Sequence, residues 1–310
     1  MGSPAATVEG FRGVRVSRRF LGRLRAGDQI AGLITASAAL VVLAITALLV
    51  YELFGSSALS RAKFGWSFLF SRAWDPVAGQ FGALPFIYGT VVTSALALAM
   101  AVPLGVGAAV FLSELAPPRI SDALTFIIEL LAAVPSVIYG LLGIFVLVPL
   151  MRHLGAPYGV GVMTAAVVLA IMILPFIVSI SREALMSVPR EQREAALALG
   201  ATRWEATWQV VVPYAKLGII GSVFLALARA LGETMAVTMV IGNNPVIASS
   251  LLAPGYSIAA VIANEFTEAT ADLHLSALIE LGLVLFVLTI ILNGLARLLI
   301  LSTTRRGSEL

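Results

Sequence analysis

The stretch that decides the fold of this chain runs from residue 194 to residue 213 and reads EAALALGATRWEATWQVVVP. It is a short segment of charged and small residues that lies between two very apolar parts of the chain. A polar segment of this length is too short to fold as a domain of its own. We therefore expect a docking element, which indicates a membrane subunit that is driven by a partner.

The composition indicates a membrane protein. Hydrophobic residues make up 59% and charged residues 12% of the 310 positions, whereas soluble domains carry about 25% charged residues. The chain has no cysteine, which excludes disulfides and thiolate metal sites, and its two histidines are too few for a histidine metal cluster. The net charge of +3 comes from basic residues beside apolar segments, so it indicates membrane orientation and predicts no nucleic-acid partner.

Six segments are long and apolar enough to cross the hydrocarbon core, which takes about 20 apolar residues. The predicted spans are about 29–54, a segment within 76–113, and about 120–151, 158–181, 212–241 and 275–301. The first apolar run is too long for a signal peptide, so we expect it to remain as a membrane helix. Four prolines, Pro103, Pro135, Pro175 and Pro213, lie inside spans or at the start of the fifth and predict bent helices around a central path.

Basic residues in short loops predict the orientation of these spans. Six arginines precede the first span, and further arginines lie in the loop between the fourth and fifth spans. The loop after the fifth span carries Glu265, Glu268 and Asp272 and no basic residue. Both termini and the stretch 194–213 are therefore expected on the cytoplasmic side of the cell membrane. Basic residues within 55–80 oppose this arrangement weakly.

Two short helices are predicted in the loop between the fourth and fifth spans. Ser187 and Pro189 are typical of a helix start, and Gly200 is typical of a helix end. Thr202 and Glu205 have the spacing of a capping box, so a second helix is expected to begin there.

The first of these helices is suited to lie against another protein. Its small residues Ala195, Ala196 and Ala198 allow close approach, and Trp204 after the bend is a side chain of the kind that anchors interfaces. Glu194 is expected to hold the bend by accepting backbone hydrogen bonds. An amphipathic helix that rests on the lipid surface is the alternative interpretation.

The spacing of this stretch resembles the EAA loop of type I ABC importer permeases. Glu-Ala-Ala precedes a glycine, and an apolar-x-apolar-proline sequence closes the loop. The resemblance implies an all-α fold, a polytopic bundle of six transmembrane helices with a cytoplasmic two-helix coupling loop. It also implies that this loop docks in a cleft of an ATPase subunit. The residues expected to couple are Glu194, Ala195, Ala196, Gly200, Ala201, Trp204 and Pro213.

Three further stretches resemble phosphate importers. ELLAAVPSVIYG at 129–140 is similar to the third span of phosphate permeases, and RALGETMAVTMVIGN at 229–243 and IANEF at 262–266 are similar to the PstC-type permease subunit. The resemblance covers about residues 80–303. It implies a heterodimer with a second phosphate permease subunit, two ATPase subunits, an extracytoplasmic phosphate-binding protein and a surrounding lipid bilayer.

Arg229 and Glu233 are charged residues inside the predicted fifth span. A charge within a span is costly and usually faces a cavity or a partner. Their spacing of four places them on one helix face, and a planar guanidinium suits a tetrahedral oxyanion. From position alone, an ion pair between helices explains them equally well, whereas the resemblance favours the substrate pathway. The residues expected along this pathway are Arg229, Glu233, Thr234, Ser136 and Tyr139.

Other acidic residues carry weaker expectations. Glu233 is expected to select the cargo, because phosphate at neutral pH still carries a proton for a carboxylate to accept and sulfate does not. Glu129 and Glu280 are expected to hydrogen-bond within the bundle. Glu265 and Glu268 in the outer loop either contact a solute-binding protein or form a solvated face.

The chain has no glycine-rich loop of the P-loop type, so ATP and Mg²⁺ are expected on the partner ATPase subunits and no cofactor in this chain. We predict a transport subunit and not an enzyme, a permease that moves inorganic phosphate into the cytoplasm by alternating access. The alternatives are a sulfate or molybdate permease and an ATP-independent channel or secondary transporter, which the lack of a detectable internal repeat disfavours. The predicted organisation is a basic arm (1–28), a first helix with an extracytoplasmic segment (29–82), a transport domain (83–303, with the coupling loop at about 187–213) and a cytoplasmic tail (304–310).

Overall fold

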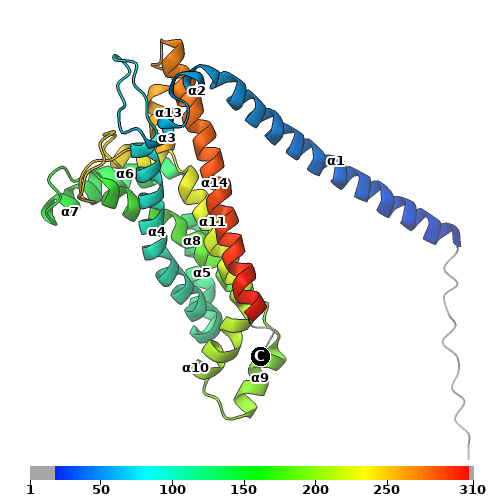
Figure 1. The fold of residues 1–310 in the computed structure, drawn as a ribbon. Coiled ribbons are helices and arrows are strands. Elements are labelled where there is room, and N and C mark those ends of the chain that lie inside the picture. The colour runs from blue at the N-terminus through cyan, green and yellow to red at the C-terminus, as the bar shows by residue number, and fades with distance from the viewer. Residues whose placement is uncertain (1–17, 307–310) are drawn as a thin grey trace, which may run out of the picture. The chain divides into compact units, whose positions relative to one another are not determined.

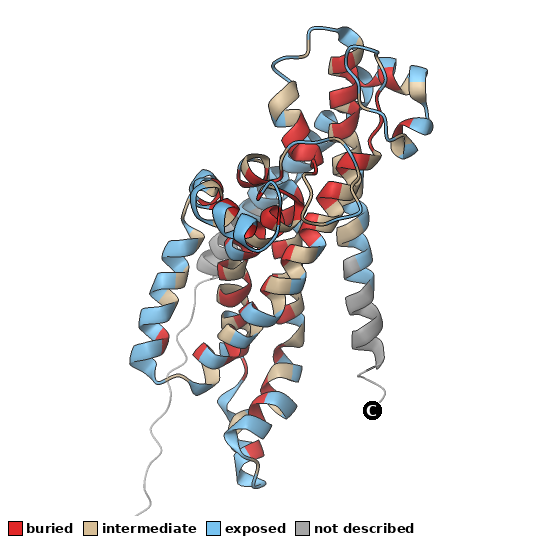
Figure 2. Ribbon diagram, turned by 90° about the vertical axis from the view of Figure 1, so that its left-hand side faces the viewer, coloured by how far each residue is buried: buried red, intermediate tan, exposed pale blue. Residues whose placement is uncertain are grey.

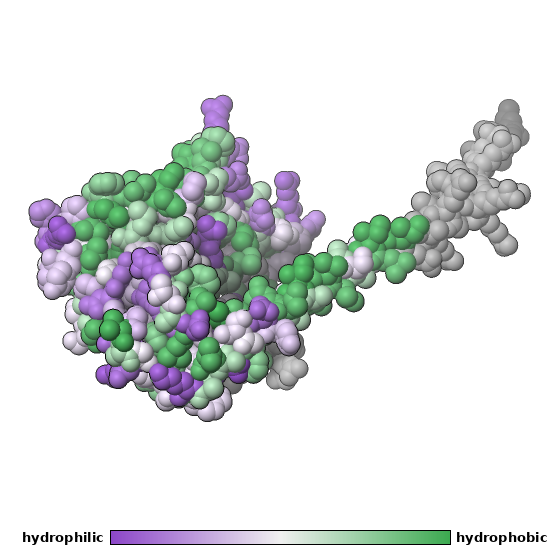
Figure 3. Space-filling view, turned by 90° about the horizontal axis from the view of Figure 1, so that it is seen from above, coloured by the Kyte–Doolittle hydropathy of each residue, from purple (hydrophilic) through white to green (hydrophobic). Residues whose placement is uncertain are grey.

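The structure is a computed structural model that describes residues 18–306, with side chains described for residues 30–295, 297 and 298. Within this part the regular secondary structure is helical, apart from an isolated β-bridge between Asp75 and Gln80. The chain forms two compact units, Met1–Glu52 and Leu53–Leu310. The first unit holds most of α1 (Arg18–Ser56), whose described side chains are mainly hydrophobic (Figure 3).

Six helices among the described residues are long and apolar enough to cross a membrane, which confirms the predicted all-α bundle of six spans. Helices suit this role because lipid offers no partner for free backbone N–H and C=O groups. The spans are Ile30–Ser56, Leu84–Leu115, Ser136–His153, Val162–Met186, Arg203–Gly232 and Asp272–Leu295.

Four long helices form the core of the second unit (Figure 1). They are α4 (Leu84–Val110), α8 (Val162–Met186), α11 (Val212–Gly232) and α14 (Asp272–Arg306). α8 packs against both α4 and α11, and buried residues gather where the helices meet (Figure 2). Small and hydroxyl side chains allow this close packing. The hydroxyls of Ser181 on α8 and Ser222 on α11 are 2.8 Å apart, and Gly218 lies against Ala184.

Prolines have different effects at different positions. Pro103 and Pro175 lie inside unbroken helices. Pro135 instead separates α5 (Pro118–Ala132) from α6 (Ser136–Leu142). The single third span predicted from the sequence is therefore wrong, because the chain forms two helices there. The physical reason is that proline disfavours the helical conformation of the preceding residue and offers no N–H.

Three π-helical turns in the described residues each end two positions before a proline. They are η1 (Phe111–Leu115) before Pro117, η2 (Gly143–Leu147) before Pro149 and η3 (Thr207–Val211) before Pro213. A wider turn accommodates a proline that cannot donate to the preceding turn. After η2 the chain continues as α7 (Val148–His153). η3 joins α10 (Arg203–Ala206) to α11, so the fifth span begins at Arg203 and not near residue 212 as predicted.

The predicted two-helix loop is present as α9 (Arg190–Ala198) and α10. Gly200 ends the first helix with a φ of +90°, a left-handed conformation that glycine adopts without a Cβ clash. Thr202 and Glu205 form the predicted capping box. The Glu205 carboxylate accepts from the Thr202 N–H at 2.8 Å, and the Thr202 hydroxyl accepts from the Glu205 N–H.

Two details of the predicted loop are wrong. The Ser187 hydroxyl does not cap α9, because it donates to the carbonyl of Ala184 at 2.8 Å and Pro189 stands at the N-cap. The Glu194 carboxylate accepts no backbone hydrogen bond among the described residues, so it does not hold the bend. The capping box at Thr202 is the feature that fixes this turn.

The end of the second unit opposite the loop is formed by the segment before α4 and by the residues around α13 (Figure 1). Its short helices are α2 (Ala58–Phe64), α3 (Ser67–Phe70) and α13 (Ile258–Glu265). Buried aromatic residues hold this end together, among them Phe68, Phe81, Phe86 and Tyr256. The Trp74 Nε1 donates to the Glu265 carboxylate at 3.0 Å, and the same Glu265 oxygen lies 3.0 Å from the His274 Nε2. Glu265 therefore bridges two parts of the chain.

Candidate substrate pathway and docking loop

The fifth span is interrupted beside the two charged residues expected in the pathway. α11 ends at Gly232, Glu233 is extended (φ −70°, ψ 124°), and α12 (Met235–Val240) follows. The expectation that Arg229 and Glu233 share one helix face is therefore wrong. The Glu233 carboxylate accepts from the Ala236 N–H at 3.3 Å, and such local bonds from a side chain compete with a continuing helix. Glycine before it weakens the helix further.

Arg229 rests on an aromatic ring. Its guanidinium carbon Cζ lies 4.3 Å from the ring centroid of Phe176 on α8, a contact that holds a cation without using its N–H donors. The Arg229 Nε is buried and has no hydrogen-bond partner among the described residues. A guanidinium with free donors inside a span is suited to bind a tetrahedral oxyanion through two hydrogen bonds.

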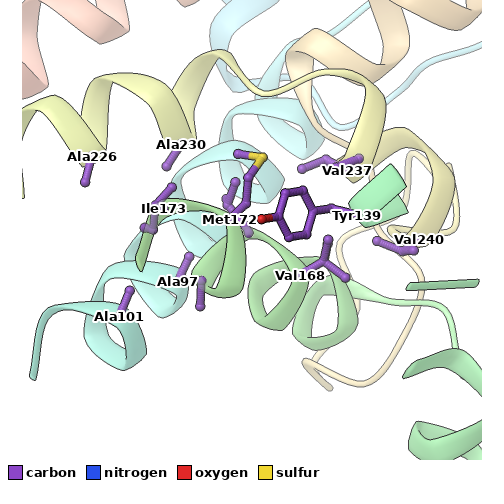
Figure 4. Close-up of a cluster of buried hydrophobic side chains, with 14 of the residues drawn as sticks. Ala97, Ala101, Tyr139, Val168, Met172, Ile173, Ala226, Ala230, Val237 and Val240 are labelled. Atoms are coloured by element: carbon purple, nitrogen blue, oxygen red, sulfur yellow. The ribbon is translucent and has the colours of Figure 1, made fainter. Parts of the chain in front are cut away.

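Tyr139 and Ser136 lie on the other interrupted helix. Ser136 is the first residue of α6, directly after the break at Pro135. The Tyr139 ring packs near Val168 and Val237 (Figure 4), and its hydroxyl donates to the carbonyl of Leu131 at 2.7 Å across that break. The hydroxyl thus satisfies a carbonyl that the break leaves free.

The two breaks are brought together where α6 packs on α12. Gly140 makes this possible, because a Cβ there would lie 2.5 Å from the Met239 Sδ and 3.2 Å from the Ala236 Cα. Thr234 is at the second break, where its hydroxyl donates to the carbonyl of Gly232 at 3.3 Å. The five residues expected in the pathway are thus distributed over two neighbouring breaks.

The docking loop, which consists of α9, α10 and the turn between them, presents a mainly exposed surface. Within α9, Ala196 is the buried residue, whereas Glu194 and Ala195 are exposed, as is Gly200 after the end of the helix. Trp204 is 56% exposed and stacks edge-on against Trp208, with 5.5 Å between ring centroids. Ala201 is partly buried and Pro213 is exposed. A rigid pair of indoles beside small side chains is a surface suited to protein contact.

Two features of these sites were not predicted. Phe176, which holds Arg229, is an aromatic residue in an apolar helix, and nothing in its sequence context distinguishes it from a core residue. Glu114 forms an ion pair with Arg193 of α9 at 2.9 Å. A signal for that pair was present, because Glu114 is a lone charge at the end of a long apolar run.

The six apolar helices, the charged residue inside the fifth span and the exposed loop define a class of protein, a multi-pass membrane permease. Residues 101–305 match the family described as binding-protein-dependent transport system inner membrane component, and the chain belongs to this family. The match confirms the resemblance to importer permeases seen in the sequence.

Curated relatives are similar over most of the chain. A phosphate transport system permease protein PstC of Mesorhizobium japonicum is 45% identical, over 97% of this chain and 99% of that protein. A protein of the same name from Haemophilus influenzae is 47% identical, over 86% of this chain and 90% of that protein. The similarity therefore includes both interrupted helices and the docking loop.

Solved structures show the same fold at low sequence identity. An inward-facing MetNI methionine ABC transporter matches with a TM-score of 0.57 at 17% identity, over 74% of this chain and 99% of that chain. A bacterial ABC transporter involved in the import of the acidic polysaccharide alginate matches with a TM-score of 0.55 at 17% identity, over 89% and 98%. These likenesses confirm the predicted fold of a type I importer permease.

Proposed function

We propose that this chain is the permease subunit of an ATP-driven importer and carries inorganic phosphate into the cytoplasm by alternating access. The observation that supports this cargo most directly is the Arg229 guanidinium, held on Phe176 with an unpartnered Nε beside two interrupted helices. The names of the relatives described above support the same cargo. The proposed pathway residues are Arg229, Glu233, Thr234, Ser136 and Tyr139.

A second, similar permease is the proposed partner within the membrane. α11 exposes three apolar side chains, Tyr214, Leu217 and Leu225, which are three and then eight residues apart and so lie on one side of the helix. Helices associate in lipid through small residues that allow close approach, and a Cβ at Gly221 or Gly232 of α11 would meet no atom within 4 Å. The second subunit would then lie beside Arg229 and complete the pathway, which gives the proposed heterodimer.

Two ATPase subunits are the proposed partners of the docking loops, one on each permease. In this chain the proposed coupling residues are Glu194, Ala195, Gly200, Ala201, Trp204 and Pro213 at the surface of the loop, with Ala196 buried beneath them. ATP and Mg²⁺ bind to the ATPase subunits, and the chain itself needs no cofactor. The loop and both termini then face the cytoplasm. The opposite end, with α2 and α13, faces outward and receives a phosphate-binding protein. The transport domain corresponds to residues 83–303.

Movement of the docking loop is proposed to reach Arg229 along one helix. The span from Arg203 to Gly232 is continuous from the capping box to the break beside Glu233. Closure of the ATPase pair on ATP draws the two loops together, so this span tilts and opens the pathway outward. Hydrolysis reverses the movement, and phosphate leaves Arg229 for the cytoplasm.

Labelled phosphate uptake by cells that carry Arg229→Ala tests this proposal, with assembly of the complex measured in parallel. Hydrogen bonds to a charged group contribute about 1.5–3 kcal/mol, so uptake is expected to fall about 10- to 100-fold. Arg119→Ala removes an exposed arginine of α5 and serves as the matched control, with uptake unchanged. Normal uptake by an intact Arg229→Ala complex overturns the assignment of Arg229 to the pathway.

A further inference from the structure

Arg193 joins the docking loop to two membrane helices at once. Its Nη2 lies 2.9 Å from Glu114 Oε1 and its Nε lies 3.1 Å from Glu114 Oε2, so the two side chains form a bidentate ion pair. Nη2 also donates to the carbonyl of Leu185 at 2.7 Å, and Nη1 donates to the carbonyl of Val188. We call these four residues the Arg193 network.

The members of the Arg193 network come from three different elements. Arg193 is in α9 and Glu114 is in η1 directly after α4. Leu185 lies in the last turn of α8, and Val188 lies two residues after the end of that helix. The last carbonyls of a helix lack partners within the helix and carry partial negative charge. One guanidinium therefore neutralises both the Glu114 carboxylate and the end of α8.

The surroundings of the network strengthen it. The Glu114 and Arg193 side chains are only 10% and 22% exposed. They lie over a buried apolar cluster that contains Leu112, Leu185, Val188 and Val211. Hydrogen bonds between charged groups are stronger where water is displaced. Lysine would not replace Arg193, because a single ammonium does not offer the planar set of donors that this arrangement uses.

Apart from this network, α9 has few contacts with α4 and α8. Its other packing is against α10 and η3, which lead into α11, and Ala196 is the one buried residue within this helix. The network therefore determines whether a force on α9 reaches α4 and α8 or only moves the loop.

We propose that Arg193 and Glu114 are positioning residues that transmit movement of the docking loop to α4 and α8. This connection is separate from the one that runs through η3 into α11. The inference rests on the proposed function, because it assumes that an ATPase subunit moves α9. Neither residue contacts the cargo.

Coupled transport in the assembled complex tests this role. The complex is reconstituted in liposomes, and labelled phosphate uptake and ATP hydrolysis are measured together. Glu114→Gln keeps the size of the side chain and removes its charge, and Arg193→Lys keeps the charge and removes the planar donors. Both variants are expected to assemble and hydrolyse ATP, with at least about a tenfold fall in phosphate imported per ATP.

Two comparisons separate this role from a general structural one. Glu114→Asp keeps the charge and is expected to import more phosphate per ATP than Glu114→Gln. If only the size of the side chain mattered, Glu114→Gln would import more than Glu114→Asp. Glu191→Gln removes an exposed carboxylate on the same helix and is expected to behave as the original protein. An unchanged ratio of uptake to hydrolysis in both Glu114→Gln and Arg193→Lys overturns the proposal.

A distance measurement keeps this test independent of the cargo. The chain has no cysteine, so cysteines placed at Leu115 and Gln192, both exposed, take spin labels at these two sites alone in this subunit. The distance is expected to stay narrowly distributed with and without ATP, and to broaden in the Glu114→Gln background. A narrow distribution in that background overturns the proposal. Absence of phosphate uptake in the original protein would instead count against the proposed function and leave this readout valid.

Discussion

Arg229 lies with its guanidinium carbon 4.3 Å from the ring centroid of Phe176, so a cation–π contact joins α11 to α8 within the membrane-spanning part of the chain. The contact stabilises the cation through the face of the guanidinium. The N–H donors of a guanidinium point outward in its plane, so a ring stacked on its face leaves these donors available to an anion. Phe176 therefore orients Arg229 and does not compete with the cargo.

Phe176→Leu is expected to weaken phosphate transport without preventing assembly. Loss of a cation–π contact costs about 0.5–2 kcal/mol, which corresponds to about a 2- to 30-fold rise in the phosphate concentration that half-saturates uptake. Initial rates of labelled uptake over a range of phosphate concentrations measure this change. Phe176→Tyr keeps the aromatic face and is expected to stay close to the original protein. Equal half-saturation in the leucine variant contradicts the orienting role.

Glu233→Gln is expected to admit sulfate. The carboxylate accepts a hydrogen bond from the P–OH group that phosphate still carries at neutral pH, whereas it repels sulfate, which has no proton to donate. The glutamine carbonyl still accepts the Ala236 N–H, so the break between α11 and α12 is retained. Inhibition of phosphate uptake by sulfate measures the effect, and about tenfold less sulfate is expected to suffice. Unchanged exclusion of sulfate shows that Glu233 does not select the cargo.

Much of the architecture is predictable from the sequence, because lipid tolerates few alternatives. An uninterrupted apolar run of helix-forming length has to be a helix in a membrane, so the spans around α4, α8 and α14 were found. The bend of the docking loop was also predicted, because Gly200 and the pair Thr202 and Glu205 act through local backbone chemistry.

The interruptions of the helices were not predictable in the same way. Pro103 and Pro175 have the same intrinsic properties as Pro135, yet only Pro135 of these three separates two helices. At Pro135 the Tyr139 hydroxyl satisfies the Leu131 carbonyl across the break, and α6 packs against α12, which is distant in sequence. The lone charge of Glu114 at the end of an apolar run indicates that it needs a partner, but its contact with Arg193 links positions 79 apart in sequence, so no local pattern identifies that partner.

Gly89→Ala is expected to destabilise the end of the bundle opposite the docking loop. A Cβ at Gly89 would lie 2.0 Å from the carbonyl oxygen of Tyr256, and backbone does not move aside as a flexible side chain does. Overpacking of this kind costs about 1–3 kcal/mol. Gly107→Ala on the same helix meets no atom within 4 Å and is the matched control, with stability unchanged or slightly raised. Thermal unfolding in detergent compares the two, and equal midpoints contradict the prediction.

Thr202→Ala is expected to loosen the turn between α9 and α10 and to reduce coupling. It removes the hydroxyl that accepts from the Glu205 N–H, at a cost of about 1 kcal/mol in local helix stability. Because α10 and η3 continue into the span that carries Arg229, a frayed start transmits less movement. Phosphate uptake is expected to fall by about fivefold while ATP hydrolysis by the assembled complex persists. Thr202→Ser retains the hydroxyl and is expected to transport normally, so equal losses in both variants would assign the effect to the methyl group and not to the cap.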